Sequence, residues 1–292
     1  MRFGAIEAGG TKFVCSVGNS DGILEDRVQF PTERPEVTLA KVTEYFADKE
    51  IQAIGIGSFG PLELDASSPE YGHLTTTPKP GWSGYPLLPH LKRAFHVPFG
   101  LDTDVNAAAY GEAKWGAAQR LDSCIYITIG TGVGIGIYAE GRLVHGLVHP
   151  EGGHLFVRRH PEDGFPGTCP FHGDCLEGMA SGPALEKRWG LPGGALPEDH
   201  PAWRMQAYYI GQAVADAILL LSPKKVILGG GVMKQAQLLP MVRQEVQRRL
   251  NGYVNAKAIL EDIDEYVTAP GLGDDAGLLG ALALGIDAWK DR

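Results

Sequence analysis

Four side chains in one irregular part of the sequence could hold a metal ion. They are His154, Cys169, His172 and Cys175. The last three form a Cys-x2-His-x2-Cys clamp, and two thiolates with two imidazoles suit tetrahedral Zn²⁺. Four protein ligands leave no open position for an activated water, so the pattern predicts a structural zinc site rather than a catalytic one. The alternative interpretation is a loop with unrelated surface histidines and free cysteines.

Two glycine-rich turns could bind phosphate groups, because glycine permits close approach and backbone angles that point N–H groups inward. Each turn joins two apolar, strand-like runs, once within residues 3–17 and again within residues 125–138. The turn residues are Gly9, Gly10, Thr11 and Lys12 in the first copy and Gly130, Thr131 and Gly132 in the second. A tight hairpin without a ligand explains either turn alone, but the duplication favours two related lobes that hold one nucleotide.

The two most common nucleotide motifs are absent from the sequence. No glycine is followed by lysine, which excludes a Walker A loop, and Ile135 stands where a dinucleotide fingerprint needs its third glycine. A third cluster, Gly229-Gly230-Gly231, separates a strand-like run from a predicted helix and could accept a base or a phosphate. The glycine turns therefore point away from both common nucleotide folds.

Carboxylates occur where a strand-like run ends and a helix is predicted to begin, a place where catalytic groups on α/β sheets tend to lie. Asp104 immediately precedes that helix and is a candidate base, although an N-cap role also explains Asp104 and Asp102. Glu151 and Glu177 bracket the predicted zinc loop. Carboxylates on a metal-braced loop suit recognition of sugar hydroxyls, whereas each one alone is more often a solvated surface charge.

The elements that must position these groups alternate between short apolar runs and segments with helical spacing, which predicts an α/β architecture. Helices are expected at Val37–Lys49, Leu87–His96, Val105–Ala118, Ala202–Leu221, Lys234–Leu250 and Ala276–Trp289. Two segments, Pro61–Tyr85 and His149–Gly178, lack regular periodicity. Long loops in compact domains tend to be functional.

Length and charge exclude several classes of protein. The chain has 292 residues, which allows two modest domains or one large one. It contains 26 lysines and arginines against 35 acidic residues, a net charge of −9, so binding to nucleic acid or to an anionic membrane is not expected. The first residues contain no apolar signal segment, and no stretch approaches ~18 apolar residues. We therefore expect a cytoplasmic protein.

These features together resemble the ROK family of sugar kinases. The family signature is similar to Ile127-Thr-Ile-Gly-Thr-Gly-Val-Gly-Ile followed by Gly141-Arg142, Gly146 and Gly152-Gly153-His154. Four further segments resemble the bacterial fructokinase branch of that family: Glu7–Phe13, Thr77–Trp82, His149–His154 and Cys169–Gly178. The resemblance covers essentially the whole chain.

The resemblance implies an actin/hexokinase-type α/β fold of two ribonuclease-H-like lobes with an interlobe cleft. Residues 1–115 and the C-terminal helix 275–292 would form the first lobe, with one phosphate turn and the catalytic aspartate. Residues 116–274 would form the second lobe, with the other phosphate turn, the zinc loop and the adenosine site. A homodimer is a further expectation from the family.

The resemblance also implies that the protein transfers the γ-phosphoryl group of ATP to a hexose, with Mg²⁺ bound to ATP and a structural Zn²⁺ in the loop. The fructokinase branch implies D-fructose as the acceptor, at O6, with Asp104 as general base. The ATP-binding residues carried over by position are Gly9, Gly10, Thr11, Lys12, Gly130, Thr131, Gly132, Pro183, Gly229, Gly230 and Gly231. The sugar-binding residues carried over are Thr103, Asp104, Glu151, His154 and Glu177.

Some positions depart from the family pattern. Glu7 stands where the family commonly has aspartate, and it still offers a carboxylate to the Mg²⁺ shell. Thr103 replaces a common asparagine, which removes an amide from the sugar side and weakens the case for glucose-type recognition. His172 replaces a cysteine of many relatives and is an equally competent zinc ligand.

Three other functions compete with a fructokinase. A kinase for mannose, glucose or an N-acylmannosamine is the nearest alternative, because loop residues decide the acceptor. A sugar-responsive regulator is the second, but regulators of this family carry an added N-terminal DNA-binding region, whereas this chain enters its first predicted strand near Arg2. A noncatalytic sugar-binding protein is the third, and Asp104 with both phosphate turns argues against it.

Overall fold

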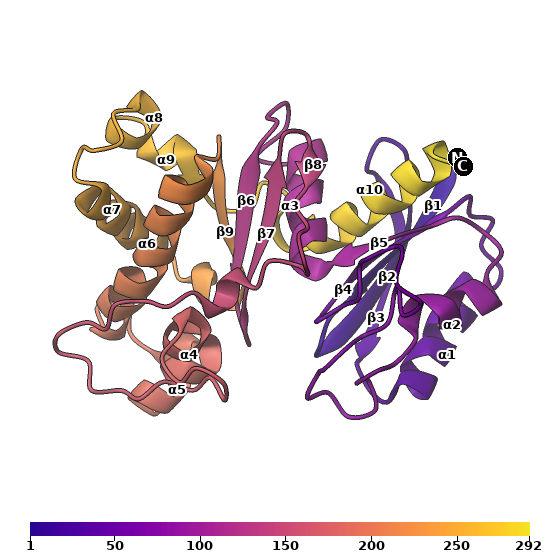
Figure 1. The fold of residues 1–292 in the computed structure, drawn as a ribbon, viewed down its shortest axis with the longest axis horizontal. Coiled ribbons are helices and arrows are strands. Elements are labelled where there is room, and N and C mark those ends of the chain that lie inside the picture. Colours follow the sequence, from indigo (N-terminus) through magenta and orange to yellow (C-terminus); the bar gives the residue numbers. More distant parts are fainter. The chain divides into compact units, whose positions relative to one another are not determined.

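The computed structural model describes residues 1–292 and divides them into two compact units (Figure 1). Unit 1 contains Met1–Arg120, Arg142–Pro150 and Asp274–Arg292, and unit 2 contains Leu121–Gly141 and Glu151–Gly273. The chain therefore returns to unit 1 twice, first with a nine-residue segment and finally with its C-terminal helix. No helix combines the length and the apolar character needed to cross a membrane.

Unit 1 is built on a five-stranded mixed sheet with the order β3-β2-β1-β4-β5. Its strands are β1 (Arg2–Ala8), β2 (Lys12–Asn19), β3 (Leu24–Pro31), β4 (Ile54–Ser58) and β5 (Phe99–Thr103). The first three strands are antiparallel, whereas β4 and β5 run parallel to β1. The register aligns Ile6 with Ile56 and Ile56 with Leu101, so apolar side chains line up across the sheet centre.

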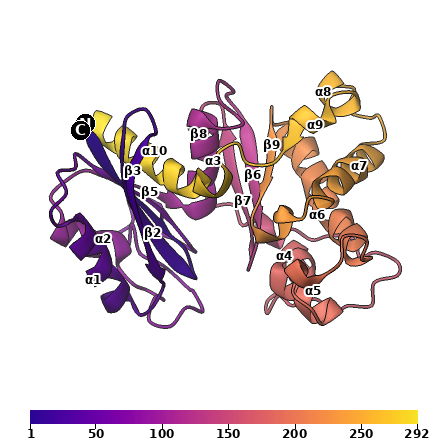
Figure 2. The same cartoon turned by 180° about the vertical axis from the view of Figure 1, so that it is seen from behind.

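Helices cover both faces of this sheet, as Figures 1 and 2 show from opposite sides. One face packs against α1 (Pro35–Phe46), with α2 (Leu87–Ala94) beside it, and the other against α10 (Ala276–Lys290), which packs on α3 (Asp104–Trp115). In α1, Leu39, Val42 and Phe46 recur at helical spacing and are buried. The N-terminus and C-terminus of the chain lie side by side in this unit.

Glycine lets α10 approach its neighbours until backbone meets backbone. A Cβ atom added to Gly280 would overlap the carbonyl of Ala107 in α3, and one added to Gly55 would overlap the carbonyl of Ala281. An added Cβ atom at Gly111 would lie 2.5 Å from the Ala276 oxygen. The packing of α10 on α3 and β4 therefore requires glycine at these positions.

The second five-stranded sheet has the order β10-β9-β6-β7-β8, and all of its strands except the edge strand β8 belong to unit 2. Its strands are β6 (Cys124–Ile129), β7 (Val133–Ala139), β8 (Arg142–Leu143), β9 (Val226–Gly229) and β10 (Val267–Thr268). The helices of unit 2 are α4 (Leu176–Ala180), α5 (Gly182–Trp189), α6 (Ala202–Leu221), α7 (Leu238–Leu250), α8 (Lys257–Leu260) and α9 (Ile263–Tyr266). Short 3-10 turns occur at η1 (Gly152–His154), η2 (Gly193–Ala195) and η3 (Gly231–Lys234). A fourth, η4 (Gly273–Asp275), lies where the chain re-enters unit 1. Apolar residues of β6, β9, α6 and α7 form one continuous core.

The predicted duplication and most predicted helices are confirmed. Both glycine turns join antiparallel hairpins, β1–β2 and β6–β7, and α6 spans the predicted Ala202–Leu221. The helix expected at Lys234–Leu250 begins later, at Leu238, because η3 occupies Gly231–Lys234 first. The structure adds β3, an edge strand of the first sheet that was not predicted, and the short helices α4, α5, α8 and α9.

We expect Gly280→Ala to lower the free energy of unfolding by about 3 kcal/mol or more, because the methyl group must displace the backbone of α3. Urea unfolding followed by circular dichroism measures this loss. The matched control is Gly194→Ala, where no heavy atom lies within 4 Å of the added Cβ atom. Gly194→Ala should leave the free energy of unfolding unchanged or raise it by up to about 1 kcal/mol. Equal stability of the two variants would contradict the proposed close packing.

Candidate functional site

The first glycine turn closes the β1–β2 hairpin of unit 1. The Gly9 N–H donates to the Lys12 oxygen at 2.9 Å, and the Gly9 oxygen accepts a hydrogen bond from the Thr32 hydroxyl at 2.6 Å. A Cβ atom at Gly10 would meet no heavy atom within 4 Å, so the tip of the turn is open. Burial raises the pKa of Glu7 at the end of β1, although Lys12 and Arg27 lower it. The turn thus presents open backbone beside a desolvated carboxylate.

The second glycine turn, in unit 2, lies against two other predicted site segments. The Gly182 N–H donates to the Gly130 oxygen at 2.7 Å, which brings the start of α5, and with it Pro183, to the turn. At Gly230, φ is +90° and an added Cβ atom would overlap the Ile129 carbonyl, so the third glycine cluster also packs beside this turn. The residues predicted to bind adenosine and phosphate in unit 2 therefore share one edge of the sheet.

Glu177 lies beside the second turn. Its Oε2 accepts the N–H of Val133 at 3.0 Å, and a Cβ atom added to Gly132 would lie 2.7 Å from the same oxygen. Glu151 is in the same neighbourhood: desolvation raises its pKa, the nearby His154 lowers it and the Glu177 carboxylate raises it further. The predicted sugar-binding residues are divided between the units, with Thr103 and Asp104 in unit 1 and the other three in unit 2.

In unit 1, the junction of β5 and α3 holds the candidate base. Thr103 is the N-cap of α3, because its Oγ1 accepts the Asn106 N–H at 3.2 Å. Asp104 is the first residue of the helix, half-buried, and its Oδ1 accepts the Val105 N–H at 2.8 Å. The capping role that could have explained Asp104 thus belongs to its neighbour.

Asp102 forms a buried network that the sequence did not indicate. Its Oδ1 accepts the Thr103 N–H at 2.7 Å and the Asn106 side-chain amide at 2.9 Å. Its Oδ2 lies 2.8 Å from Nε2 of His145, which arrives with the segment Arg142–Pro150. The hydrogen bond to Asp102 raises the pKa of His145. No local pattern could have revealed this pair, because 43 residues separate its members.

The four predicted metal ligands come together in unit 2. Their ligand atoms all lie within 4.8 Å of one another. Nδ1 of His154 is 3.5 Å from the Cys175 sulfur and 3.7 Å from the Cys169 sulfur, and Nδ1 of His172 is 3.6 Å from the Cys169 sulfur. A tetrahedral ion with bonds of about 2.0–2.3 Å has ligand-to-ligand edges of about 3.3–3.8 Å. These three separations fall within that range, so the four side chains form a possible metal-binding group.

The buried thiols of this cluster would have to ionise to bind a metal ion. Burial raises the pKa of the Cys175 thiol to about 11. At neutral pH such a thiol becomes a thiolate only when a metal ion or another positive charge stabilises it. The chemistry of the donor set and its geometry thus agree.

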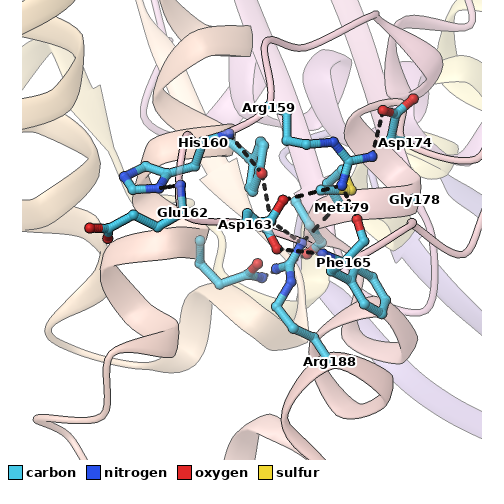
Figure 3. Close-up of polar contacts among 12 residues, drawn as sticks. Arg159, His160, Glu162, Asp163, Phe165, Asp174, Gly178, Met179 and Arg188 are labelled. Carbon is cyan, nitrogen blue, oxygen red and sulfur yellow. Dashed lines mark hydrogen bonds and ion pairs between the residues drawn. The ribbon is translucent and has the colours of Figure 1, made fainter.

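The loop that carries the cluster is fastened to α5 and α6 by a second, buried network (Figure 3). The Arg188 guanidinium lies 3.0 Å from the Asp163 carboxylate, and both side chains are at least 94% buried. The Tyr209 hydroxyl donates to Asp163 at 2.6 Å, and burial raises the pKa of Tyr209 to about 12, so the hydroxyl keeps its proton. Arg188 also stacks on the Phe165 ring at 4.6 Å. The loop is held at this network as well as at the predicted metal.

Comparison with known proteins gives consistent matches over the whole chain. A profile of the ROK family matches residues 3–288. The chain is 52% identical over 287 residues to a putative fructokinase from Bacillus subtilis, with 98% of this chain and 96% of that protein aligned. It is 45% identical over 291 residues to a fructokinase from Pediococcus pentosaceus, with both chains fully covered. Among solved structures, a ROK hexokinase from Thermus thermophilus matches with a TM-score of 0.82 and 28% identity, over the full length of both chains.

These matches and the two separate sheets confirm the predicted fold class, an actin/hexokinase-type α/β fold. The two sheets share one arrangement, in which an antiparallel hairpin forms the first two strands. The duplicated hairpins found in the sequence are these strands, β1–β2 in one sheet and β6–β7 in the other.

We expect Arg188→Met to destabilise the protein by about 3–5 kcal/mol, because it leaves the Asp163 carboxylate buried without its cation. Urea unfolding followed by tryptophan fluorescence measures the change. As a control, Lys224→Met breaks the exposed ion pair with Asp122 and should leave the unfolding midpoint unchanged. Similar midpoints for the two variants would show that the buried pair does not hold the loop.

Proposed function

The chain belongs to the ROK family, and we propose that it is an ATP-dependent fructokinase that transfers the γ-phosphoryl group of ATP to O6 of D-fructose. Fructose is proposed as the acceptor because the chain is 52% and 45% identical, over nearly its whole length, to two relatives named putative fructokinase and fructokinase. Sequence identity to the hexokinase structure is 28%, which supports the kinase fold but says less about the acceptor.

In this proposal Asp104 is the general base. The sugar O6 attacks the γ-phosphorus and loses its proton to Asp104, while the bond between that phosphorus and the β–γ bridging oxygen breaks and ADP leaves. The half-buried position of Asp104 at the start of α3 supports the role, because the Val105 N–H fixes one carboxylate oxygen. General-base assistance contributes about 10²- to 10⁴-fold to such reactions.

The phosphates are assigned to the backbone amides of the two turns, one in each unit. Phosphoryl transfer has a loose transition state, so positioning and charge neutralisation are the main tasks of the protein. The open tip at Gly10 and the contacts of Gly130 with the start of α5 support this assignment. Mg²⁺ bound with ATP would neutralise phosphate charge, and Glu7 would offer a carboxylate to its shell. Pro183 and Gly229–Gly231 are assigned to adenosine.

A structural Zn²⁺ is assigned to the cluster of His154, Cys169, His172 and Cys175. All four coordination positions would be occupied by the protein, so the ion would brace the loop rather than activate water. The ion would join η1 to the start of α4, and these elements hold Glu151 at one end and Glu177 at the other. Nδ1 of His154 faces the sulfurs, so its Nε2 is the atom assigned to a sugar hydroxyl. A homodimer completes the proposal.

We expect Asp104→Asn to keep the fold and lose about 10²- to 10⁴-fold in turnover, because the base is removed while its size is preserved. ADP release from Mg-ATP is measured against fructose, mannose, glucose and N-acetylmannosamine, with fructose expected as the best acceptor. Asp48→Asn, an exposed carboxylate of unit 1, is the matched control and should match the wild type. Turnover of Asp104→Asn within tenfold of the wild type would exclude Asp104 as the base, and preference for another hexose would replace the acceptor.

Freshly purified protein should contain about one zinc ion per chain, measured by inductively coupled plasma mass spectrometry. We expect His172→Ala to lose the ion and to melt at a lower temperature, because the loop is then held only by the Arg188 network. His73→Ala, in unit 1, should retain the zinc. Metal-free wild-type protein, or a full zinc content in His172→Ala, would refute the assignment.

A further inference from the structure

Unit 1 contains a cavity of about 450 Å³ whose walls come from two segments, residues 63–66 and residues 145–149. Two of the lining side chains are histidines, His145 and His149. Neither has a role in the function proposed above. A volume of this size lies within the range of small-molecule pockets.

His145 is held in a defined orientation. Its Nε2 lies 2.8 Å from Asp102, whose carboxylate is 96% buried and is itself fixed by the Thr103 N–H and the Asn106 amide. A buried carboxylate that orients an imidazole in this way fixes which ring nitrogen carries a proton toward it. The imidazole remains 39% exposed, and its Nδ1 makes no hydrogen bond with the protein.

His149 adds an unsatisfied group to the same cavity. The residue is 93% buried, and its Nδ1 has no hydrogen-bond partner in the protein. Burial lowers the pKa of His149, so its ring is neutral. A polar atom that is buried without a partner is costly, and a ligand hydroxyl in the cavity would remove that cost.

The charges around the cavity restrict the ligand. Glu63 and Asp65 also line the cavity, and their carboxylates disfavour a phosphorylated or carboxylated ligand. The two imidazoles offer nitrogen atoms that can hydrogen-bond a hydroxyl group. A neutral molecule that both donates and accepts hydrogen bonds fits this lining, and a polyhydroxylated sugar has this character.

We propose that His145 is a sugar-binding residue whose Nδ1 accepts a hydrogen bond from a hydroxyl of the acceptor sugar, and that Asp102 is the positioning residue that orients the ring through Nε2. The assignment rests on the proposed function, because the sugar is taken to be the fructose that is phosphorylated. The competing role is a structural tether that holds the segment Arg142–Pro150 on unit 1. Only the sugar-binding role predicts a change confined to the fructose KM.

The test compares His145→Gln with His96→Gln, an exposed histidine of the same unit. We expect His145→Gln to raise the KM for fructose up to about tenfold, the size expected when one hydrogen bond to the sugar is lost. The KM for ATP and the zinc content should stay at wild-type values, and His96→Gln should match the wild type throughout. A lower melting temperature with an unchanged fructose KM would identify a tether and overturn the proposal.

Asp102→Asn should raise the fructose KM in the same direction, with kcat changed much less. The double variant Asp102→Asn with His145→Gln should be no worse than His145→Gln alone, because both changes remove one interaction. Additive increases in KM would overturn the positioning role of Asp102. An active wild type with unchanged KM in His145→Gln overturns this inference alone, whereas a wild type inactive on every sugar overturns the proposed function and this inference together.

A measurement on the wild-type protein tests the proposed contact with fructose independently of whether the variants fold. Diethyl pyrocarbonate labels accessible imidazole nitrogens, and peptide mass mapping reads each histidine separately. Saturating fructose should reduce the labelling of His145 and leave that of His96 unchanged. Equal labelling of His145 with and without fructose would overturn the proposal.

Discussion

Helix α10 can lie on the sheet of unit 1 only because glycine stands where main chains meet. Gly55 on β4, Gly111 on α3 and Gly280 on α10 leave no room for a Cβ atom. This contact closes one face of the sheet and fixes α3 against it. The position of α3 in turn determines where Asp104, its first residue, is held. The close backbone contact at these glycines therefore determines the position of Asp104, the proposed base.

Unit 2 contains most of a long loop without regular periodicity, within His149–Gly178. Two sets of contacts fix the conformation of this loop. The His and Cys cluster gathers four ligand atoms within 4.8 Å of one another, and the buried pair of Arg188 and Asp163 ties the same loop to α5. Burying an ion pair gains little net stability, but breaking it is costly. Such a pair is therefore suited to specifying one loop conformation.

The N-terminal end of α3 concentrates polar groups with separate tasks. Thr103 caps the helix, Asp104 is the proposed base, and Asp102 turns inward to His145. The three residues are consecutive in sequence, but their side chains point in different directions because β5 ends and α3 begins between them. Side chains that are neighbours in sequence can thereby serve the fold, the reaction and the proposed sugar site.

The sequence by itself determined the features that depend on near neighbours. The glycine turns, the span of α6 and the spacing of Cys169, His172 and Cys175 are local patterns, and the structure contains each of them. Tertiary structure alone decided the return of Arg142–Pro150 to unit 1, the bond of Glu177 to the second turn, and the pairing of Asp102 with His145. Periodicity and turn preferences act over a few residues, whereas these contacts join segments that only packing of the whole unit brings together.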